Sequence, residues 1–511
     1  MEELAASLSI VITSKGLLLI LAGCLVALLL GMLPGLSSTE AMIMLLPFSY
    51  SLNLHESMLL LSSAYASAFV GGALTSIVFG IPGSSTGLAT VFDGHALHRS
   101  GKTIYAVTVA SVSSAVAGLL ALGVVVLLMP IMEPLSLLFG PPEWFAFVLF
   151  GLVVLAFSDE SNFTRGLISA GLGLLAGTVG MAVMTAEPRY TLGISDLWGG
   201  IPIIAAFVGL YPLAEAFGMM KKKTKPSEQK SLKATHLEKG QVLEGCKDCA
   251  RHGDKIIIGG ATGWIIGIIP GVGATLANIL AYLLVKSTSK NNENFGKGDV
   301  RGLIAAESAN NGSVGGALVP ALALGIPGSL NTAILLGVFL INGIQPGANV
   351  FAENLDVTWS ILIAVAAGTI LASVIVMAGG WRVVSLVSKL RPETIAPIII
   401  VISCIAVLLA RNNPFDLGLA VVFAILGILM QRFSFSRISF VIALMLGPLI
   451  ESSYFQSLSI GRGSYEVFVS SPMSLILWTV IALAVGLHFV RLIRSGKAKK
   501  TNRITEALDG E

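Results

Sequence analysis

The chain has 511 residues, of which 54% are hydrophobic and only 12% are charged. This composition excludes an ordinary soluble domain and is typical of a protein with many membrane-spanning helices. Several windows of about 18 to 26 residues are apolar enough to cross a bilayer as helices. Examples without Asp, Glu, Lys or Arg are 104–129, 166–186, 357–380 and 473–490. We therefore predict an all-α polytopic membrane protein with about 10–13 membrane segments.

The chain begins with MEELAASLSI, which lacks the basic start and the small-residue cleavage site of a removed signal peptide. The first apolar run, from Gly16 to Leu33, is therefore expected to remain in the mature protein. Together with the next run, Leu36–Ser49, it is too long for one straight span at about 1.5 Å rise per residue. A break in the helix is expected between them.

Four proline–glycine pairs interrupt apolar segments in this way. Proline removes a backbone donor and clashes with the preceding turn, and glycine permits a sharp reversal. Such irregular backbone persists at membrane depth only where protein or a polar cavity covers it. Each pair is predicted to be the tip of a re-entrant hairpin or the gap of a discontinuous helix. The pairs are Pro34–Gly35, Pro82–Gly83, Pro270–Gly271 and Pro327–Gly328.

Small, mostly polar residues follow each break, where a new half-helix begins. The free N–H groups and the positive dipole end of a helix N-terminus suit an anion, so four converging ends would form a pocket for a small carboxylate. The alternative is that small residues only permit close packing or kinking. Repetition at four breaks favours a substrate-binding site. Its predicted residues are Ser37, Ser38, Thr39, Ser84, Ser85, Thr86, Gly273, Ala274, Thr275, Ser329, Asn331 and Thr332.

The breaks belong to an internal repeat. GMLPGLSSTEA, from Gly31, matches GIIPGVGATLA, from Gly267. GGALTSIVFGIPGS, from Gly71, matches GGALVPALALGIPGS, from Gly315. Two matches in the same order at a nearly constant offset indicate internal duplication.

Loop charges indicate how the two repeats lie in the membrane. The connection 50–56 has no Lys or Arg, whereas 286–301, after the corresponding break of the second half, has four. The positive-inside rule then predicts two inverted-topology repeats, an arrangement that many secondary transporters share. The same rule predicts an external N-terminus and a cytoplasmic C-terminus. Loops 159–165, 381–391 and 431–437 are expected inside, and 130–143, 187–199, 411–416 and 451–471 outside.

A polar segment separates the halves. Residues 221–255 hold ten Lys/Arg and five Asp/Glu, and the tail from Arg491 holds six more basic residues, so both are predicted to be cytoplasmic. Nucleic-acid binding is disfavoured because both runs are juxtamembrane and lack interleaved aromatic residues. The predicted domains are 1–220, the first transmembrane repeat; 221–255, the basic cytoplasmic linker; 256–495, the second repeat with scaffold helices; and 496–511, the cytoplasmic tail.

The linker contains a CxxC motif, Cys246 and Cys249, with His236 and His252 nearby. A single CxxC pair is a zinc signal of low specificity, and reduced, unliganded thiols are the favoured interpretation. We therefore expect no metal site and no cofactor apart from a coupling cation.

Three acidic residues near the breaks are candidates for coupling to a cation, because an ionisable group at membrane depth is costly and often functional. Glu40 opens the first half-helix and Asp93 lies in GLATVFDGHAL. Glu307 precedes Asn310 and Asn311, which are added to the predicted binding residues. A helix cap or an interfacial position is the alternative for Glu40 and Asp93.

An enzyme is disfavoured. Residues 83–87 match G-x-S-x-G and His95 follows, but a nucleophile elbow needs a strand of an α/β sheet before the serine, and an apolar membrane segment stands there. The sequence also has no Walker A motif for direct ATP coupling.

The chain resembles the large membrane subunit of the tripartite tricarboxylate transporters. The most specific motifs are ESANNGSVGGALVPALALGIPGS at 307–329, INGIQPG at 341–347, PGVGATLANILAY at 270–282 and TVFDGHAL at 90–97. The resemblance implies ion-driven secondary import of small carboxylates across the cytoplasmic membrane, with sodium or protons as the coupling cation. It also implies a small membrane subunit and an extracytoplasmic substrate-binding protein as partners.

The chain departs from the family pattern within the predicted pocket. Ser37 and Ser38 stand where glycine and proline are usual, and Ser84 stands where an acidic residue is frequent. A tricarboxylate, a dicarboxylate or an aromatic acid is therefore compatible with the resemblance. The alternative function is a non-transporting membrane scaffold or a channel subunit, and the concentration of polar residues at the breaks disfavours a channel.

Overall fold

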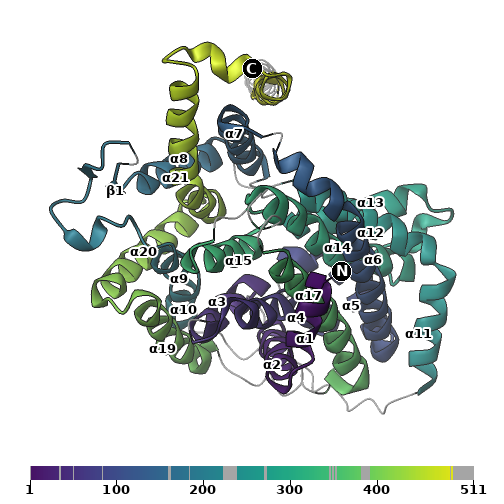
Figure 1. Ribbon diagram of the computed structural model, residues 1–511. Coiled ribbons are helices and arrows are strands. Elements are labelled where there is room, and N and C mark those ends of the chain that lie inside the picture. The colour runs from purple at the N-terminus through teal and green to yellow at the C-terminus, as the bar shows by residue number, and fades with distance from the viewer. Residues whose placement is uncertain are drawn as a thin grey trace, which may run out of the picture.

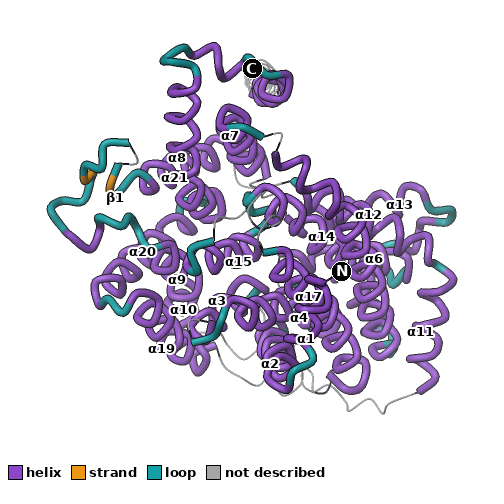
Figure 2. The backbone as a smooth tube through the Cα atoms, in the orientation of Figure 1, coloured by secondary structure: helices purple, strands orange, loops and turns teal. Residues whose placement is uncertain are grey.

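The protein is described by a computed structural model that covers residues 2–33, 36–49, 51–82, 85–137, 139–158, 163–182, 184–221, 239–269, 273–344, 347, 350, 354–380, 382, 392–483 and 485–486. Helices make up almost all of this backbone, and the described strands form one short antiparallel hairpin (Figures 1 and 2). The elements are α1 Glu2–Val11, α2 Ser14–Gly31, α3 Ser38–Ser49, α4 Leu54–Phe79, η1 Ser85–Gly87, α5 Leu88–Arg99, α6 Thr103–Leu137, α7 Pro141–Ser158, α8 Phe163–Gly177, β1 Gly180–Met181, β2 Pro188–Arg189, η2 Ser195–Leu197, α9 Ile203–Val208, η3 Gly209–Leu213, α10 Ala214–Lys221, α11 Lys239–Arg251, α12 Gly253–Ile268, α13 Gly273–Thr288, η4 Asn292–Asn294, α14 Val300–Leu324, α15 Leu330–Ile341, α17 Leu355–Ile375, η5 Val376–Gly380, α19 Pro392–Arg411, α20 Pro414–Arg432, α21 Arg437–Ile460 and η6 Tyr465–Val469.

The predicted all-α class is confirmed. Within the described residues, 7 helices are long and apolar enough to cross a membrane, and several shorter apolar helices accompany them. The long ones are Ser14–Gly31, Leu54–Phe79, Thr103–Met132, Ile203–Met220, Leu355–Gly379, Pro414–Arg432 and Arg437–Ile460. These are the features of a multi-pass membrane protein.

Three predicted boundaries are wrong. The window 166–186 is not one span: α8 ends at Gly177, and Gly180, with φ 122°, begins the hairpin in which β1 pairs with β2. The predicted loops 130–143 and 451–471 are partly helical, because α6 continues to Leu137 and α21 to Ile460. In α21 the charged Glu451 is paired with Arg189 at 2.7 Å.

The second part of the predicted linker is also ordered. Residues 239–251 form α11, which packs along the start of α6 at one edge of the molecule (Figure 1). The Tyr105 hydroxyl donates to Asp248 Oδ2 at 2.7 Å, and Lys102 pairs with Glu244 at 3.3 Å. Residues 222–238 lie outside the described residues.

The first break of each repeat lies between two helices that form a hairpin. Lys15, at the start of α2, pairs with Glu56, at the start of α4, at 2.7 Å. Further along, Gly23 lies against Leu60 and Gly31 against Ala68, so α2 and α4 run side by side in the same direction. The intervening α3 must therefore run back. A re-entrant hairpin, one of the two predicted forms, accounts for this path.

The second repeat has the same construction. Gly259, Gly263 and Gly267 of α12 lie against Ala305, Ala309 and Ser313 of α14. These parallel helices again require α13 to return toward the start of α12. Glycine is needed along this crossing because a Cβ would strike the backbone of α14. The hairpin tips, 34–35 and 270–272, lie outside the described residues.

The long helices α4 and α14 both end at a left-handed glycine, Gly80 with φ 65° and Gly325 with φ 63°. Each stands two residues before the proline of the second proline–glycine pair of its repeat, in the sequence Gly-Ile-Pro-Gly. The reversal is therefore made by Gly80 and Gly325, whereas Gly328 does not have a positive φ. Our assignment of the sharp turn to the glycine after the proline is wrong at Gly328.

A long helix of each half packs against a helix of the other half. Helix α4 packs along α17, where Gly368 lies against Ser63, and α14 packs along α6, where Gly315 lies against Ala121. The end of α4 meets the start of α14 through Gly94 of α5, since a Cβ there would lie 2.8 Å from Ile77 and 3.4 Å from Leu303. Helix α4 therefore ends where α14 begins.

Candidate binding site

A cavity of about 220 Å³ lies where the breaks of both repeats meet. Segments from all four breaks contribute to its lining, although they are far apart in the sequence. Ten of the residues predicted from the sequence line it: Ser37, Ser38, Thr39, Glu40, Thr86, Ala274, Thr275, Gly328, Ser329 and Asn331. Residues that sequence reasoning missed complete the lining: Tyr65, Phe69, Tyr211, Gly267, Ser313, Ala317, Leu330 and Ile438.

The start of α3 is capped by its own side chains. Glu40 Oε2 accepts a hydrogen bond from the Ser37 backbone N–H at 2.7 Å and another from the Ser37 hydroxyl. The Ser37 hydroxyl oxygen in turn accepts from the Thr39 N–H at 3.2 Å. Glu40 therefore has the capping role that the sequence analysis left as its alternative, and its carboxylate still contributes to the cavity wall.

The start of α15 is capped in a comparable way. The Ser329 and Thr332 side chains each accept from the other residue's backbone N–H, at 3.3 and 2.9 Å, which forms a capping box. Thr332 is fully buried and does not line the cavity. Ser329 does line it and also hydrogen-bonds the Tyr65 hydroxyl at 3.2 Å.

One amide joins the two helix starts across the cavity. Asn331 Nδ2 donates to the Ser38 hydroxyl oxygen at 2.7 Å, and Asn331 Oδ1 accepts from the Thr39 hydroxyl at 2.9 Å. All three side chains are buried. The first break of one repeat is therefore linked directly to the second break of the other.

The electrostatics of the cavity depend on helix ends. Its described lining contains one carboxylate, Glu40, and no Lys, Arg or His. Helices α3, α13 and α15 all begin at its wall, and η1 contributes Thr86. Their N-termini are the positive ends of the helix dipoles, so the space suits a small anion. Some of the backbone N–H groups at the starts of α3 and α15 already bond the capping side chains.

Some predicted residues cannot be placed in this site. Pro34, Gly35, Gly83, Ser84, Pro270 and Gly271 lie outside the described residues, and nothing is described of the Ser85 side chain. Gly273 is the first residue of α13, and Pro82 and Pro327 lie in the non-helical turns after α4 and α14. A Cβ on Gly328 would lie 2.8 Å from the Ala317 Cα, so this glycine allows the turn to approach α14 closely.

Glu307 is fully buried outside the cavity lining, at the contact of α14 with α6 and α5. Its carboxylate accepts hydrogen bonds from the Thr90 hydroxyl and, at 3.1 Å, from the Ser114 hydroxyl. One turn further along α14, Asn310 Oδ1 and both polar side-chain atoms of Asn311 are buried without a hydrogen-bond partner among the described residues. Unpaired buried amides are costly and call for a missing ligand or water.

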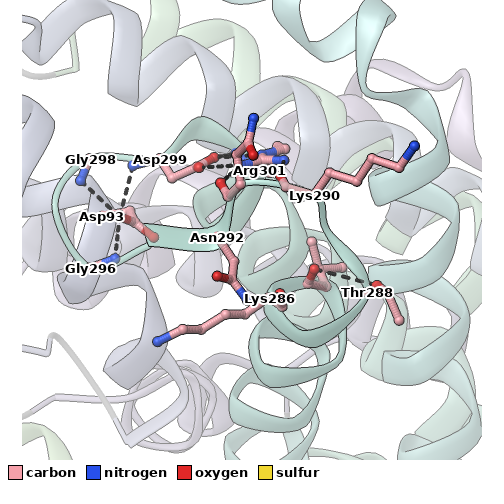
Figure 3. Close-up of polar contacts among 11 residues, drawn as sticks. Asp93, Lys286, Thr288, Lys290, Asn292, Gly296, Gly298, Asp299 and Arg301 are labelled. Atoms are coloured by element: carbon pink, nitrogen blue, oxygen red, sulfur yellow. Dashed lines mark hydrogen bonds and ion pairs between the residues drawn. The ribbon is translucent and has the colours of Figure 1, made fainter. Parts of the chain in front are cut away.

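Asp93 has a different environment, shown in Figure 3. Its Oδ1 accepts from the backbone N–H groups of Gly296, Gly298 and Asp299, each at 2.8 Å. These residues belong to the connection between α13 and α14, so α5 of the first half holds a loop of the second half. These bonds support a structural role for Oδ1, whereas Oδ2 is buried without a hydrogen-bond partner among the described residues. A role of Asp93 in cation coupling stays a prediction, and the cation site proposed below is built on Glu307 instead.

The CxxC motif does not form a metal centre among the described residues, where no group of three or more His, Cys, Asp or Glu side chains has a metal-binding arrangement. Cys249 is buried against α6, with its Sγ 3.7 Å from the Val109 carbonyl oxygen, and the His252 ring bonds the Asp248 carbonyl oxygen at 2.9 Å. His236 lies outside the described residues. His95, which a hydrolase would require, is bonded to the Ile77 carbonyl oxygen at 3.0 Å.

Broken helices that meet at a cavity with polar side chains on its wall, within a multi-pass helical protein, are the features of a membrane transport component. Residues 17–442 match the model of the tripartite tricarboxylate transporter TctA family, and the chain belongs to that family. The resemblance predicted from the sequence is thus confirmed.

Two relatives come from Agrobacterium vitis. An "uncharacterized 52.8 kDa protein in TAR-I ttuC' 3'region" is 30% identical over 507 residues, which cover 98% of this chain and 99% of the relative. An "uncharacterized protein in TAR-II ttuC' 3'region" is also 30% identical, over 236 residues that cover 46% of this chain and 96% of the relative. No solved structure matches the chain.

Proposed function

We propose that the protein is a secondary active importer that couples entry of a small carboxylate to a cation by alternating access, and that it performs no enzymatic reaction. The observation that carries this proposal is the cavity, where helix starts from both repeats contribute to the wall of one space. Helix N-termini offer donors to a carboxylate without a basic side chain. Family membership supports the same substrate class and a tripartite assembly.

The coupling cation is proposed to bind at Glu307, Asn310 and Asn311. Carboxylate and amide oxygens are the ligands that hard cations prefer, and the asparagine atoms lack partners among the described residues. A proton on Glu307 is the alternative coupling ion. An inward cation gains about 2.3 kcal/mol per charge per 100 mV, so the membrane potential drives import only if the cations outnumber the negative charges of the acid.

Uptake of labelled acids into proteoliposomes tests the function. The protein is reconstituted with the small membrane subunit and binding protein of its assembly, and sodium and proton gradients are imposed in turn. Wild type is expected to accumulate acid only with one of the gradients. Equilibration without any gradient would instead indicate a channel, and no entry under any condition would indicate a scaffold.

A substitution then tests the cation site. Glu307→Gln is expected to abolish the increase in acid uptake that the cation gradient causes, while the protein remains folded. Asp93→Asn is the matched control, because it weakens the hydrogen bonds that hold the loop at 296–299. It should lower the yield of folded protein without changing how acid uptake depends on the cation gradient. Unchanged coupling in Glu307→Gln would contradict the proposed cation site.

The two repeats are proposed to be inverted in the membrane, with the N-terminus outside and the C-terminus and 221–255 in the cytoplasm. In support, α2 and α4 start together, whereas α4 ends beside the start of α14. Single cysteines at Ser51 and Lys290, in a cysteine-free background, test this. Both residues are exposed, and Ser51 avoids Asn53, which caps α4. Only the cysteine at 51 should react with an impermeant thiol reagent from outside, and labelling of both from one side would refute inversion.

We further propose the cytoplasmic membrane as the location, with 1–220 and 256–495 as the two membrane parts joined by the basic segment. The small membrane subunit and the extracytoplasmic binding protein are supported by the family description alone. Co-purification with the tagged chain tests both partners, and recovery of neither after mild solubilisation would contradict the assembly.

A further inference from the structure

Part of the cavity wall comes from outside the four breaks. Tyr211 lies in η3, a single π-helical turn that interrupts the helix formed by α9 and α10. Such turns arise where the regular backbone pattern is broken and are frequent at functional sites. Here Pro212 lies inside the turn, and it has no N–H to donate. The distortion brings Tyr211 to the cavity from a helix that belongs to neither hairpin.

The Tyr211 hydroxyl is buried and has no hydrogen-bond partner among the described residues. The whole residue is 5% exposed. A buried tyrosine normally satisfies its O–H, and an unsatisfied buried hydroxyl destabilises the fold. Tyr211 is one of the residues that line the cavity, so a molecule bound there is the nearest candidate partner for its unpaired hydroxyl.

A positively charged side chain, Arg437, lies over the Tyr211 ring. The Arg437 guanidinium lies 4.9 Å from the Tyr211 ring centroid, in a cation–π contact. Arg437 also donates to the Leu210 carbonyl oxygen at 3.0 Å and to Glu215 Oε1 at 2.8 Å, so two further contacts fix its position. Its neighbour in the chain, Ile438, lines the cavity.

We propose that Tyr211 is a substrate-recognition residue whose hydroxyl donates a hydrogen bond to a carboxylate oxygen of the transported acid. The proposal rests on the proposed function and deepens it by naming a donor outside the four breaks. Arg437 acts through the ring: its positive charge makes the phenol a better donor, and Glu215 balances that charge. Arg437 is a positioning residue, and Tyr211 contacts the acid.

The charge of the cavity explains why such a donor is useful. Glu40 contributes a carboxylate to the wall and interacts electrostatically with both Tyr211 and Arg437. An anion therefore enters a space that already holds an acidic group. The neutral Tyr211 hydroxyl, with the Arg437–Glu215 ion pair beside its ring, attracts the anion. Because Arg437 is already paired, no unpaired positive charge is left in the cavity when the acid is absent.

Tyr211→Phe isolates the hydroxyl because it keeps the ring and its contact with Arg437. Ligand affinity is measured on the purified chain by isothermal titration, with citrate, succinate and benzoate as tricarboxylate, dicarboxylate and aromatic probes. The variant should bind the preferred probe roughly 10- to 100-fold more weakly, as expected for loss of a hydrogen bond to a charged group. The melting temperature of the ligand-free variant should be unchanged or higher, because an unpaired buried hydroxyl has been removed.

Tyr105→Phe is the matched control. Its hydroxyl bonds Asp248 at 2.7 Å, far from the cavity lining. This variant should show the reverse pattern, with a lower melting temperature and unchanged affinity. Wild-type affinity in Tyr211→Phe, or a lower ligand-free melting temperature, would overturn the proposal, since the latter means that the hydroxyl has a structural partner. If wild type binds none of the three probes, the carboxylate function itself fails, which is a different result from loss of binding only in the variant.

Discussion

The amide that joins the two helix starts leads to a prediction about coupling between the repeats. Asn331→Ala removes the hydrogen bonds to Ser38 and Thr39, of 2.7 and 2.9 Å. At about 0.5–1.5 kcal/mol for each bond, the free energy of unfolding should fall by roughly 1–3 kcal/mol. Because the lost partners border a cavity that can admit water, we expect the lower part of this range.

Thr39→Val removes only one of these bonds and should lower the free energy of unfolding by about 1 kcal/mol. In the double variant the shared bond is lost once, so the combined effect should fall short of the sum by about 0.5–1.5 kcal/mol. Denaturant unfolding of the detergent-solubilised protein measures all four forms. Thr358→Val is the control, since the buried Thr358 hydroxyl has no partner among the described residues and its removal should not destabilise the protein. Additive effects of Thr39→Val and Asn331→Ala within about 0.5 kcal/mol would refute a direct link.

Two further predictions concern glycine packing and thiol reactivity. Gly328→Ala should lower the free energy of unfolding by roughly 1–3 kcal/mol, because its Cβ would lie 2.8 Å from the Ala317 Cα. In the control Gly337→Ala the Cβ meets nothing within 4 Å, so this variant should be neutral or stabilised by up to about 1 kcal/mol. Equal melting temperatures of the two variants would contradict the close packing at Gly328. Burial raises the pKa of the Cys249 thiol to about 12, so iodoacetamide at pH 8 should modify Cys246 and leave Cys249 unmodified, as mass spectrometry can show. Equal modification of both thiols would mean that α11 is not docked on α6.

Much of the helix arrangement and part of the cavity could be predicted because proline and glycine act locally. In this chain a helix ends just before each of the four proline–glycine pairs, and small, mostly polar residues after each pair begin the next helix. Ser38, Thr39 and Asn331 were therefore identified without knowledge of their partners. Their hydrogen bonds across the cavity could not be predicted, since they depend on how two distant segments meet.

Aromatic residues of the cavity were missed for a physical reason. Tyr65, Phe69 and Tyr211 lie in apolar helices, where an aromatic side chain is ordinarily part of the core, and only the fold brings them to the cavity. The Pro212 inside the helix at 203–221 was the one local sign of a distorted turn beside Tyr211.

The partners of the buried charged residues could not be predicted from the sequence. Asp93 is a candidate for ion coupling because a buried acid is costly, and the sequence does not show that three backbone N–H groups of a loop some two hundred residues away bind its Oδ1. Glu451 likewise pairs with Arg189, which lies more than two hundred residues away in the sequence. A charge in an apolar segment indicates that a partner exists, and the sequence does not identify that partner.

The packing of helices from one half against the other has a consequence for biosynthesis. Helix α4 packs on α2 in its own half and on α17 in the other, and α6 packs on α14, so both early helices lack a main neighbour when the first half has been made. Synthesis must proceed from Phe79 to Ile375 before the side of α4 that faces α17 is covered. At about 5–20 residues per second this takes roughly 15–60 s. During that interval the nascent chain stands in the membrane with the small-residue faces of both helices open, so its assembly depends on the ribosome finishing the second half.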